Sequence, residues 1–566
     1  MSGVRPADYP PPFAPSDAIA APTAPADERI EVGVLIVGAG PAGLACAIRL
    51  GQLLEESPQT AERLGDVPVA VVEKGKAPGS HLLSGAVVNP RGLRRLLGGA
   101  TMPSEVGAYG EVHGEAVYLL TKGTSIRIPP PPTMRNHNNW ILSLSQLGRV
   151  LAERAEGAGA AILPETSAQK LLVADGRVRG IRTDDKGVGR DGRPAGAYEP
   201  GSDIVARVTV LAEGTQGHLT GAAIRHFGLE GAQPQIWALG VKEVWKVAKP
   251  LHHIVHTMGW PLRKRARYGE FGGSFIYPMG EDMVTVGFVA GLEARDVEFS
   301  VHDVLQEFKT HRLVRRILSG GERVAWGAKT ITEGGYHSLP KRFHAPGLLL
   351  AGESAGLVNV PTLKGIHYAV ESGIMAAEAA FGALQLGESP GRIGALEPYD
   401  EALRSSYVVK DLHAVRNMRQ AFDKGFFLGG ALASAMTVTK GKLPPKEYRT
   451  EPNAARTLIR TGRGRRYPAP DGTLTFDKLS SVFLSGNRTR EDQPNHLRVQ
   501  RTVPRDLAEA WVHMCPAQVY EVGAADGELV QVELNPSNCV QCGAITAKGG
   551  RLTPPEGGSG PEYTVT

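Results

Sequence analysis

Residues 31–43 read EVGVLIVGAGPAG, and this stretch decides the fold of the N-terminal part of the chain. Its first seven residues form an apolar run of strand length, and the segment 41–50 has the periodicity of a helix. Between strand and helix, Gly38, Gly40 and Gly43 form a G-x-G-x-x-G motif. Such glycines permit a tight turn and bring the backbone close to a pyrophosphate, which the helix N-terminus then binds. The stretch therefore predicts a Rossmann-like nucleotide-binding unit.

An acidic residue follows the next apolar strand, as such a unit requires. Residues 69–73 are that strand, and Glu73 stands where a carboxylate binds ribose hydroxyls. Glu73 lies 30 residues after Gly43, more than the usual spacing of about 20. The polar insertion at 52–67 accounts for the difference.

Two later glycine–acid pairs favour FAD over NAD as the nucleotide. Each pair ends an apolar strand; they are Glu213-Gly214 after the strand 205–212 and Gly352-Glu353 after the strand 348–351. Two-domain flavoproteins bring such a late turn back to the first Rossmann unit, where it meets the ribityl chain. A helix is expected from near Lys364, and its N-terminus can stabilise negative charge on a reduced flavin.

Three of the four cysteines lie together near the C-terminus. Cys515-Pro516 is followed by Cys539-x-x-Cys542, a pattern that resembles ferredoxin-type cluster ligation by four thiolates. The natural fourth position, three residues after Cys542, is Ile545, which cannot ligate iron. Three thiolates could hold a [3Fe–4S] cluster, or a [4Fe–4S] cluster whose last iron takes water, Thr546 or another group. A degenerate domain with inert cysteines is the alternative.

Composition excludes several classes of protein. The 566 residues are 42% hydrophobic and 21% charged, as in ordinary globular proteins. A net charge of +5 is too small to indicate nucleic-acid binding but is compatible with an anionic membrane surface. Four cysteines exclude a disulfide scaffold, and no apolar run reaches the roughly 18 residues of a spanning helix.

A series of short segments, in order along the chain, resembles one family. The segments are 71–75, 81–87, 139–147, 259–262, 272–275, 359–361, 364–367, 476–486, 492–494, 515–517, 554–558 and 560–561. Together they are similar to the electron transfer flavoprotein–ubiquinone oxidoreductase family, and the resemblance runs from about Val32 to the C-terminus. It implies that electrons from reduced electron transfer flavoprotein pass to ubiquinone or menaquinone through FAD and a cluster, which in the family is [4Fe–4S].

The resemblance also implies an α/β architecture of three parts. We expect a Rossmann-like FAD-binding domain of the two-domain flavoprotein type at 30–110, 140–225 and 341–450. An antiparallel-sheet quinone-binding domain is expected at 111–139 and 226–340, and a ferredoxin-like iron–sulfur domain at 470–566. Residues 1–29, rich in Pro and Ala, are expected to be a disordered tail.

Site residues follow from the same motifs. The FAD-binding set is expected to be Gly38, Gly40, Pro41, Ala42, Gly43, Glu73, Lys74, Ser84, Gly85, Glu213, Gly214, Gly352, Glu353, Asn359, Gly365 and Ile366. Gly272 and Gly273 are expected at the quinone, and Cys515, Cys539 and Cys542 at the cluster. Phe271 stands where the family commonly has Tyr. No catalytic side chain is required, because the cofactors carry the electrons.

Membrane contact is expected to be monotopic. The apolar stretch 425–438, followed by Lys440, Lys442 and Lys446, suits a shallow insertion with a basic rim, although a plain core helix is the alternative. Since no targeting segment is visible, we expect the cytoplasmic face of a bacterial inner membrane. Proton donors to the quinone are not evident; His256, His337 and His367 are candidates only.

Two other functions compete with this hypothesis. One is a flavin-only prenyl reductase of the geranylgeranyl type, against which the C-terminal domain and its three cysteines speak. The other is a non-catalytic, membrane-associated partner of electron transfer flavoprotein, against which the complete FAD motifs speak.

Overall fold

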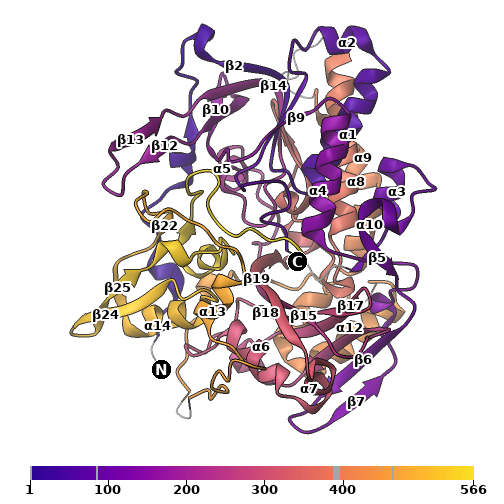
Figure 1. Cartoon of the computed structure of the whole chain (residues 1–566), viewed down its shortest axis with the longest axis vertical. Coiled ribbons are helices and arrows are strands. Elements are labelled where there is room, and N and C mark those ends of the chain that lie inside the picture. The colour runs from indigo at the N-terminus through magenta and orange to yellow at the C-terminus, as the bar shows by residue number, and fades with distance from the viewer. Residues whose placement is uncertain (1–2, 84–86, 386–394, 443, 462–463) are drawn as a thin grey trace.

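Two sheets and a C-terminal unit make up the molecule (Figure 1). The computed structural model describes residues 3–83, 87–385, 395–442, 444–461 and 464–566. The sheets follow one another along the long axis, and the C-terminal unit lies against the side of the lower sheet. This arrangement leaves the functional cavity where the three parts meet.

The upper sheet is the nucleotide-binding sheet expected from the G-x-G-x-x-G motif. Its strand order is β1-β10-β11-β14-β2-β3-β9, with β21 also paired to β14 and β20 to β21. The strands are β1 (Ile19–Ala20), β2 (Ile30–Val37), β3 (Val69–Val72), β9 (Ala161–Leu163), β10 (Ala168–Ala174), β11 (Arg177–Thr183), β14 (Asp203–Leu211), β20 (His344–Ala345) and β21 (Leu348–Leu350). The central strands β14, β2, β3 and β9 pair in parallel, as the βα repeats predict.

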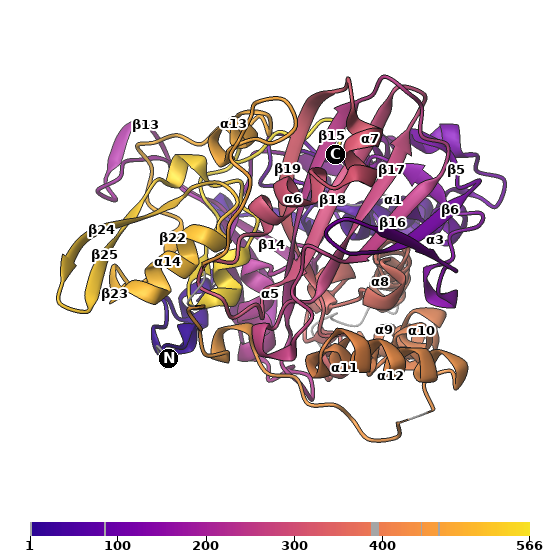
Figure 2. The same ribbon diagram turned by 90° about the horizontal axis from the view of Figure 1, so that it is seen from below.

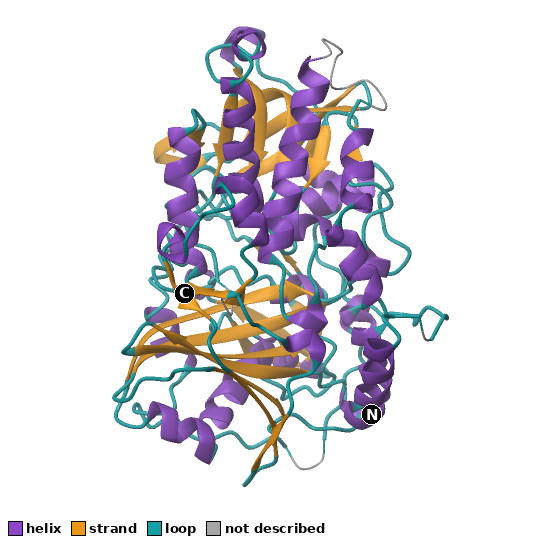
Figure 3. Cartoon of the chain, turned by 90° about the vertical axis from the view of Figure 1, so that its right-hand side faces the viewer, coloured by secondary structure: helices purple, strands orange, loops and turns teal. Residues whose placement is uncertain are grey.

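A row of helices covers one face of the upper sheet (Figure 3). Helix α1 (Pro41–Glu55) packs between α4 (Leu144–Gly157) and α8 (Ile366–Gln385). The crossing of α1 and α8 is close, because a Cβ at Gly373 would lie 2.2 Å from the carbonyl oxygen of Ala42. Other helices around this sheet are α2 (Pro58–Glu62), α3 (Arg91–Leu97), α5 (His218–His226), α9 (Glu397–Ser405) and α10 (Tyr407–Ala414).

The lower sheet has seven strands in the order β19-β15-β18-β17-β16-β6-β7. The strands are β6 (Glu115–Leu120), β7 (Ser125–Ile128), β15 (Trp237–Lys246), β16 (Ile254–Gly259), β17 (Gly272–Met279), β18 (Met283–Gly291) and β19 (Glu322–Thr332). All neighbours are antiparallel except β16 and β6, which pair in parallel. The expected antiparallel sheet is therefore confirmed apart from this pair, whose strands come from distant segments that no hairpin joins.

Smaller elements border these sheets. A three-stranded sheet contains β4 (Val87–Val88), β8 (Trp140–Leu142) and β5 (Ala108–Glu111), and a hairpin contains β12 (Lys186–Val188) and β13 (Pro194–Glu199). Helices α6 (Val301–Lys309), α7 (Arg312–Leu318), α11 (Met418–Ala421) and α12 (Phe426–Val438) belong to the lower half. Within the part of the chain that the structure describes, no helix has the length and apolar character needed to cross a bilayer.

The C-terminal unit combines two small sheets with two helices. It contains α13 (Lys478–Phe483), β22 (Leu497–Arg498), β23 (Thr502–Pro504), α14 (Arg505–Met514), β24 (Tyr520–Asp526), β25 (Leu529–Leu534) and β26 (Arg551–Leu552). The sequence predicts a separate domain here. In the structure, its buried side chains, such as Trp511 and Val530, join one hydrophobic cluster with Trp326 and Phe288 of the lower sheet.

The N-terminal segment is ordered, so the predicted disordered tail at 1–29 is wrong from Gly3 onward. Strand β1 pairs in parallel with β10, and Pro6 and Ala18 are buried. Asp203 accepts the backbone N–H groups of two residues in this segment at 3.0 and 3.2 Å. The Pro- and Ala-rich composition predicted disorder because the segment has no core of its own. It is ordered because it packs on other elements of the protein.

Candidate functional site

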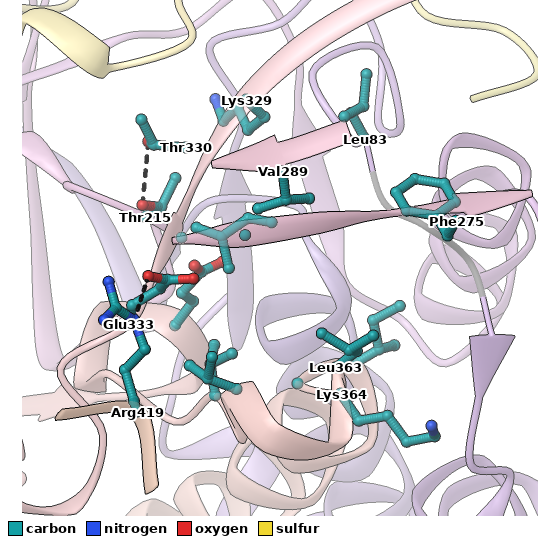
Figure 4. Close-up of a pocket in the computed structure, with 18 of the residues that line it drawn as sticks. Leu83, Thr215, Phe275, Val289, Lys329, Thr330, Glu333, Leu363, Lys364 and Arg419 are labelled. Atoms are coloured by element: carbon teal, nitrogen blue, oxygen red, sulfur yellow. Dashed lines mark hydrogen bonds and ion pairs between the residues drawn. The ribbon is translucent and has the colours of Figure 1, made fainter. Parts of the chain in front are cut away.

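A cavity of about 1140 Å³ joins the upper sheet, the lower sheet and the C-terminal unit. Its walls come from the loop between β2 and α1, the start of α8, strand β17, helix α12 and the loop that carries Cys542. Figure 4 shows part of it, with Glu333 and Arg419 paired on one wall and Leu363 and Lys364 on another. The cavity is therefore large enough, and mixed enough in chemistry, to hold two ligands side by side.

The G-x-G-x-x-G loop forms one end of the cavity. Gly38, Gly40, Pro41 and Ala42 border it, whereas Gly43 packs behind the loop. A Cβ at Gly43 would lie 2.0 Å from the carbonyl oxygen of Gly38, so this glycine serves helix–strand packing. A Cβ at Gly40 would meet only Leu82, at 3.8 Å. The space in front of Gly40 is thus open to a ligand, as a nucleotide pyrophosphate at the N-terminus of α1 requires.

Glu73 and Lys74 follow β3 at the same end. The Glu73 carboxylate accepts the N–H of Ala39 at 2.9 Å and that of Gly75 at 2.7 Å, which ties the glycine loop to the end of β3. Lys74 Nζ donates to Gln541 Oε1 at 2.7 Å, and burial lowers the pKa of Lys74 to about 8. Both residues border the cavity, where the sequence predicts a ribose-binding acid.

Glu213 and Gly214 reach the cavity at the end of β14. The Glu213 carboxylate accepts N–H groups of Leu219 at 3.0 Å and Thr220 at 2.7 Å. It therefore caps the start of α5 instead of projecting freely toward a ligand. Gly214 has a φ of +73°, and a Cβ added to it would meet no atom within 4 Å, so its backbone faces open space.

The second glycine–acid pair connects the two sheets. Glu353 accepts the N–H of Thr332 at 2.8 Å and its hydroxyl at 2.6 Å, and burial raises the pKa of Glu353. Gly352 packs beside Ala42, since a Cβ there would lie 2.8 Å from the Ala42 Cβ. This pair thus fixes the end of β19 against the start of α1.

The turn before α8 completes the nucleotide end. Gly365 and Ile366 border the cavity, whereas Asn359 is buried behind it. Asn359 and Lys364 exchange backbone hydrogen bonds of 2.8 and 3.2 Å, which hold the turn that aims the helix N-terminus at the cavity. Ser84 and Gly85, also expected at FAD, lie outside the described residues.

Gly272 and Gly273 begin β17 at the other end of the cavity. A Cβ at Gly272 would lie 2.0 Å from the carbonyl oxygen of Val289, and one at Gly273 2.7 Å from that of Thr257. Only glycine fits this close strand pairing, and the backbone of both residues borders the cavity. Phe271 precedes them, and its ring carries the Arg419 guanidinium 3.9 Å from the ring centroid.

Sequence reasoning missed a buried charge cluster on this wall. Arg419 Nε donates to Glu333 Oε2 at 2.7 Å, and its other nitrogen bonds Glu293. The three side chains are at most 5% exposed, and Glu333 and Arg419 border the cavity. Two carboxylates share one guanidinium, and burial raises the pKa of Glu333. No sequence signal joins Glu333 to Arg419, because the two lie 86 positions apart.

The three candidate histidines occupy different places. His256 borders the cavity, with Nε2 2.7 Å from the Tyr277 hydroxyl, and burial lowers the pKa of His256 to about 3. His337 and His367 do not border it; His337 lies 3.6 Å from Glu447. A histidine that stays neutral at physiological pH is a poor proton donor, so none of the three histidines stands out for that role.

Cys515, Cys539 and Cys542 come together in the C-terminal unit. Hydrogen bonds join the segments that carry them: Asn538 Nδ2 donates to the carbonyl oxygen of Gln518 at 3.2 Å, and the N–H of Asn535 donates to that of Val519 at 2.8 Å. Burial raises the pKa of all three thiols. Backbone N–H groups point at the sulfurs: those of Ala517 and Val519 reach Cys515 Sγ at 3.5 Å each. The N–H of Gln541 reaches Cys539 Sγ at 3.4 Å.

Such amides fit thiolates that ligate an iron–sulfur cluster, whose irons spread the ligands apart. Within the described residues, no three His, Cys, Asp or Glu side chains converge on the position of a single metal ion, so the cluster assignment rests on the thiols and the amides directed at them. Cys46 is buried in α1, in the core of the upper sheet, and does not belong to this group. The described chain therefore offers three thiolates at the site.

Comparisons with family models match two parts of the chain. Residues 237–331 match a family described as ETF-QO, ubiquinone-binding. Residues 472–564 match one described as electron transfer flavoprotein-ubiquinone oxidoreductase, 4Fe-4S. These matches cover most of the lower sheet and nearly the whole C-terminal unit.

Curated relatives match over almost the whole length. An electron transfer flavoprotein-ubiquinone oxidoreductase of Pseudomonas aeruginosa is 38% identical, covering 95% of this chain and 99% of the relative. The mitochondrial protein of that name from Arabidopsis thaliana is 39% identical, covering 95% and 85%. Among solved structures, a geranylgeranyl bacteriochlorophyll reductase-like protein from Thermoplasma acidophilum is similar in fold, with a TM-score of 0.54 at 18% identity. It covers 76% of this chain and 93% of that one.

Proposed function

The chain belongs to the electron transfer flavoprotein–ubiquinone oxidoreductase family, and we propose that the one cavity described above is where its quinone is reduced. As a member, it is an oxidoreductase that uses FAD and a [4Fe–4S] cluster. The observation that supports the proposal is that a single cavity connects the three groups of site residues. The glycine loop at Gly40, the glycines at the start of β17 and the loop of Cys542 all border the same cavity.

FAD binds at the upper end of the cavity in this proposal. The start of α1 receives the pyrophosphate in front of Gly40, and Glu73 lies where the ribose hydroxyls reach. Glu213, Glu353 and Asn359 act as positioning residues, because each is engaged in hydrogen bonds within the protein. FAD, when bound, supplies the centre that exchanges electrons with the quinone.

The quinone head group binds at the lower end, against the backbone of Gly272 and Gly273. We assign Glu333, one residue beyond the end of β19, as the group that takes up a proton and passes it to the quinone, because burial raises the pKa of its carboxyl group. After donating that proton the Glu333 carboxylate stays paired with the Arg419 guanidinium, which stabilises the charge. The Glu333 carboxylate then takes up a new proton from solvent in the cavity. Phe271 offers no hydroxyl for this purpose, so a carboxyl group is the nearer donor.

Membrane contact is assigned to α12. Phe427 is 67% exposed, Leu428 55% and Val438 84%, and Phe427 and Val438 also border the cavity. An apolar helix that is exposed and lines a cavity mouth suits a shallow position in one leaflet, where an isoprenoid quinone enters. Lys440 and Lys442 follow the helix and suit anionic headgroups. We assign this surface to the cytoplasmic face of a bacterial inner membrane.

A flavin-only prenyl reductase is the competing function. The fold similarity to a geranylgeranyl bacteriochlorophyll reductase-like protein covers 76% of this chain and is compatible with this function. Three cysteines with amides directed at their sulfurs, in a segment that matches a 4Fe-4S family, favour the cluster-containing enzyme.

The deciding experiment is quinone reduction by the FAD- and cluster-containing protein. Reduced electron transfer flavoprotein is the donor, and short-chain ubiquinone and menaquinone analogues are compared as acceptors. Turnover of either analogue supports the proposal and identifies the quinone. No turnover of either, with reduction of a prenyl double bond under the same conditions, would replace the proposal with the flavin-only reductase.

A further inference from the structure

The cluster site contains three thiolates where a [4Fe–4S] cluster normally takes four. The sequence has only four cysteines, and the fourth, Cys46, is buried in α1 within the core of the upper sheet. Cys515, Cys539 and Cys542 are the three in the C-terminal unit. One iron of a four-iron cluster in this site is therefore without a cysteine ligand.

Ile545 occupies the position that continues the Cys539-x-x-Cys542 spacing. It is 4% exposed, and its side chain packs on Gly550, where an added Cβ would lie 2.5 Å from Ile545 Cγ1. The same added Cβ would lie 2.8 Å from Val499 Cγ1. Ile545 is thus part of the core of the C-terminal unit, and a branched hydrocarbon side chain has no atom that can bind iron.

The described residues offer no evident substitute ligand. The described hydrogen-bond partners of the Cys515 and Cys539 sulfurs are backbone N–H groups, and none is a side chain that could ligate iron. Thr546 follows Ile545, but its hydroxyl oxygen accepts the N–H of Leu552 at 3.0 Å and the residue borders the cavity. Neither Ile545 nor Thr546 therefore replaces the missing thiolate, and we expect water as the last ligand of the fourth iron.

Three half-buried lysines bind the segments that carry the three thiols. Lys478 Nζ donates to the carbonyl oxygen of Val512 at 2.9 Å, close before Cys515. Lys329 Nζ donates to the carbonyl oxygen of Gln541 at 3.2 Å, and Lys74 Nζ to its side chain at 2.7 Å, between the other two cysteines. Backbone and amide groups next to the ligands thus hold three cations around an anionic site. This positive surrounding favours an anionic group at the three thiols over a degenerate domain with inert cysteines.

We propose that the chain holds a [4Fe–4S] cluster through Cys515, Cys539 and Cys542 alone, with one exchangeable iron at the corner that no cysteine reaches. The inference rests on the proposed function for the presence of the cluster. An oxidant such as ferricyanide takes one electron and releases that iron: [4Fe–4S]²⁺ gives [3Fe–4S]⁺, Fe²⁺ and one electron. One electron from dithionite and added Fe²⁺ reverse the step.

The missing thiolate also changes the electrostatics of the site. Each thiolate adds one negative charge, and charge in a buried site acts strongly on a redox centre. A cluster with three thiolates is one unit less negative than one with four, so it accepts an electron more readily. Its reduction potential is therefore higher than that of the same site with a fourth thiolate.

Iron exchange in the holoprotein tests the proposal. Anaerobically purified protein is oxidised with ferricyanide and treated with a chelator. Its iron and sulfide contents are then measured, and an EPR spectrum is recorded. The expected result is the loss of one iron of four with sulfide retained and the signal of an oxidised three-iron cluster. Reduction with ⁵⁷Fe²⁺ then places one ⁵⁷Fe per cluster by Mössbauer spectroscopy. Retention of all four irons through oxidation would overturn the proposal.

Ile545→Cys provides the direct test, with Ile545→Val as the matched control for lost packing. The cysteine variant is expected to keep four irons under oxidation and to have a lower cluster potential than the valine variant. Equal iron loss in both variants would contradict the proposal. If the cysteine variant does not fold, the ⁵⁷Fe exchange of the unsubstituted protein still decides.

These readouts separate the inference from the proposed function. Iron count, EPR and Mössbauer spectra do not depend on quinone turnover. A protein with one exchangeable iron that does not reduce quinone would support the cluster assignment and reject the quinone reductase. Quinone turnover by a protein whose four irons do not exchange would support the quinone reductase and reject the three-cysteine cluster.

Discussion

Gly40 and Gly43 belong to one motif but have different structural roles. A Cβ at Gly43 meets backbone at 2.0 Å, whereas one at Gly40 has only Leu82 at 3.8 Å. Helix–strand packing requires glycine at position 43, and the ligand requires it at position 40. Motif spacing cannot make this distinction, because it depends on which atoms lie in front of each residue.

Gly43→Ala is expected to destabilise the protein without FAD by about 1–3 kcal/mol, because the new methyl group forces α1 away from β2. Gly40→Ala is the contrasting variant: its melting temperature without FAD should stay unchanged while FAD affinity falls. Thermal melts and flavin content of both variants check this. Equal loss of stability in both would refute the separation of roles.

Glu333 is the second residue whose role depends on tertiary placement. Glu333→Gln removes the titratable group but keeps an oxygen that accepts from Arg419, whose charge stays paired with Glu293, so we expect the fold to be retained. We expect quinol formation to slow about 100-fold, in the range of a lost general acid. Reduction of FAD by electron transfer flavoprotein, measured by stopped-flow absorbance, should not change, since no quinone proton is involved there.

The pH profile gives an independent check of Glu333. Burial raises the pKa of this carboxyl group, so it is protonated below that raised pKa and loses its proton above it. Quinone reduction should therefore fall as the pH rises through the pKa of Glu333, and the Gln variant should lack this step. An identical profile in both proteins would show that another group supplies the proton.

Helix α12 is the element on which the membrane assignment depends. It carries two large exposed apolar side chains at its start, Phe427 and Leu428. Helix α13 also carries two, Leu479 at 48% and Phe483 at 84% exposure, but Figure 2 shows α13 on the opposite side of the molecule. The two helices therefore form a matched pair for a binding experiment.

Phe427→Glu is expected to weaken binding to vesicles of mixed neutral and anionic lipid by about tenfold or more. The reason is the loss of one buried aromatic side chain, worth about 2 kcal/mol. Phe483→Glu, with the same change on the far side, should bind as the unsubstituted protein does. Cosedimentation measures both. Equal binding of the two variants would place the membrane surface elsewhere.

Buried histidines shape the stability of the whole molecule. Burial lowers the pKa of His218, His256, His367 and His496 to about 3 in the folded protein. In the unfolded chain each titrates near 6.5. The folded state is therefore favoured fully above about pH 6.5, and this stability is lost as the pH falls toward 3.

Between pH 7.5 and 5.5 each of these histidines should cost about 1 kcal/mol of unfolding free energy. Urea titrations at the two pH values measure the total. His496→Gln removes one such group, whose two ring nitrogens have no hydrogen-bond partner in the described structure. Between pH 7.5 and 5.5, the unfolding free energy of this variant should fall by about 1 kcal/mol less than that of the unsubstituted protein. An unchanged loss would mean that His496 is already charged in the folded protein.

Local sequence patterns by themselves determined the strands and helix of the nucleotide-binding unit. The run 31–43, the strand at 69–73 and the glycine–acid pair at 352–353 predict β2, α1, β3 and β21, because apolar periodicity and glycine placement are local properties. The lone mismatch at Ile545 is also visible in sequence, since ligand spacing within one loop is local.

Only the tertiary structure decided which distant segments meet. The pairing of β16 with β6, the ordered N-terminal segment and the shared core of the C-terminal unit all join residues far apart in the chain. Glu333 and Arg419 form an ion pair across 86 positions, and three lysines from three parts of the chain bind the segments that carry the thiols. Sequence specifies such contacts only through the packing of the whole molecule, because burial and charge pairing depend on every neighbour at once.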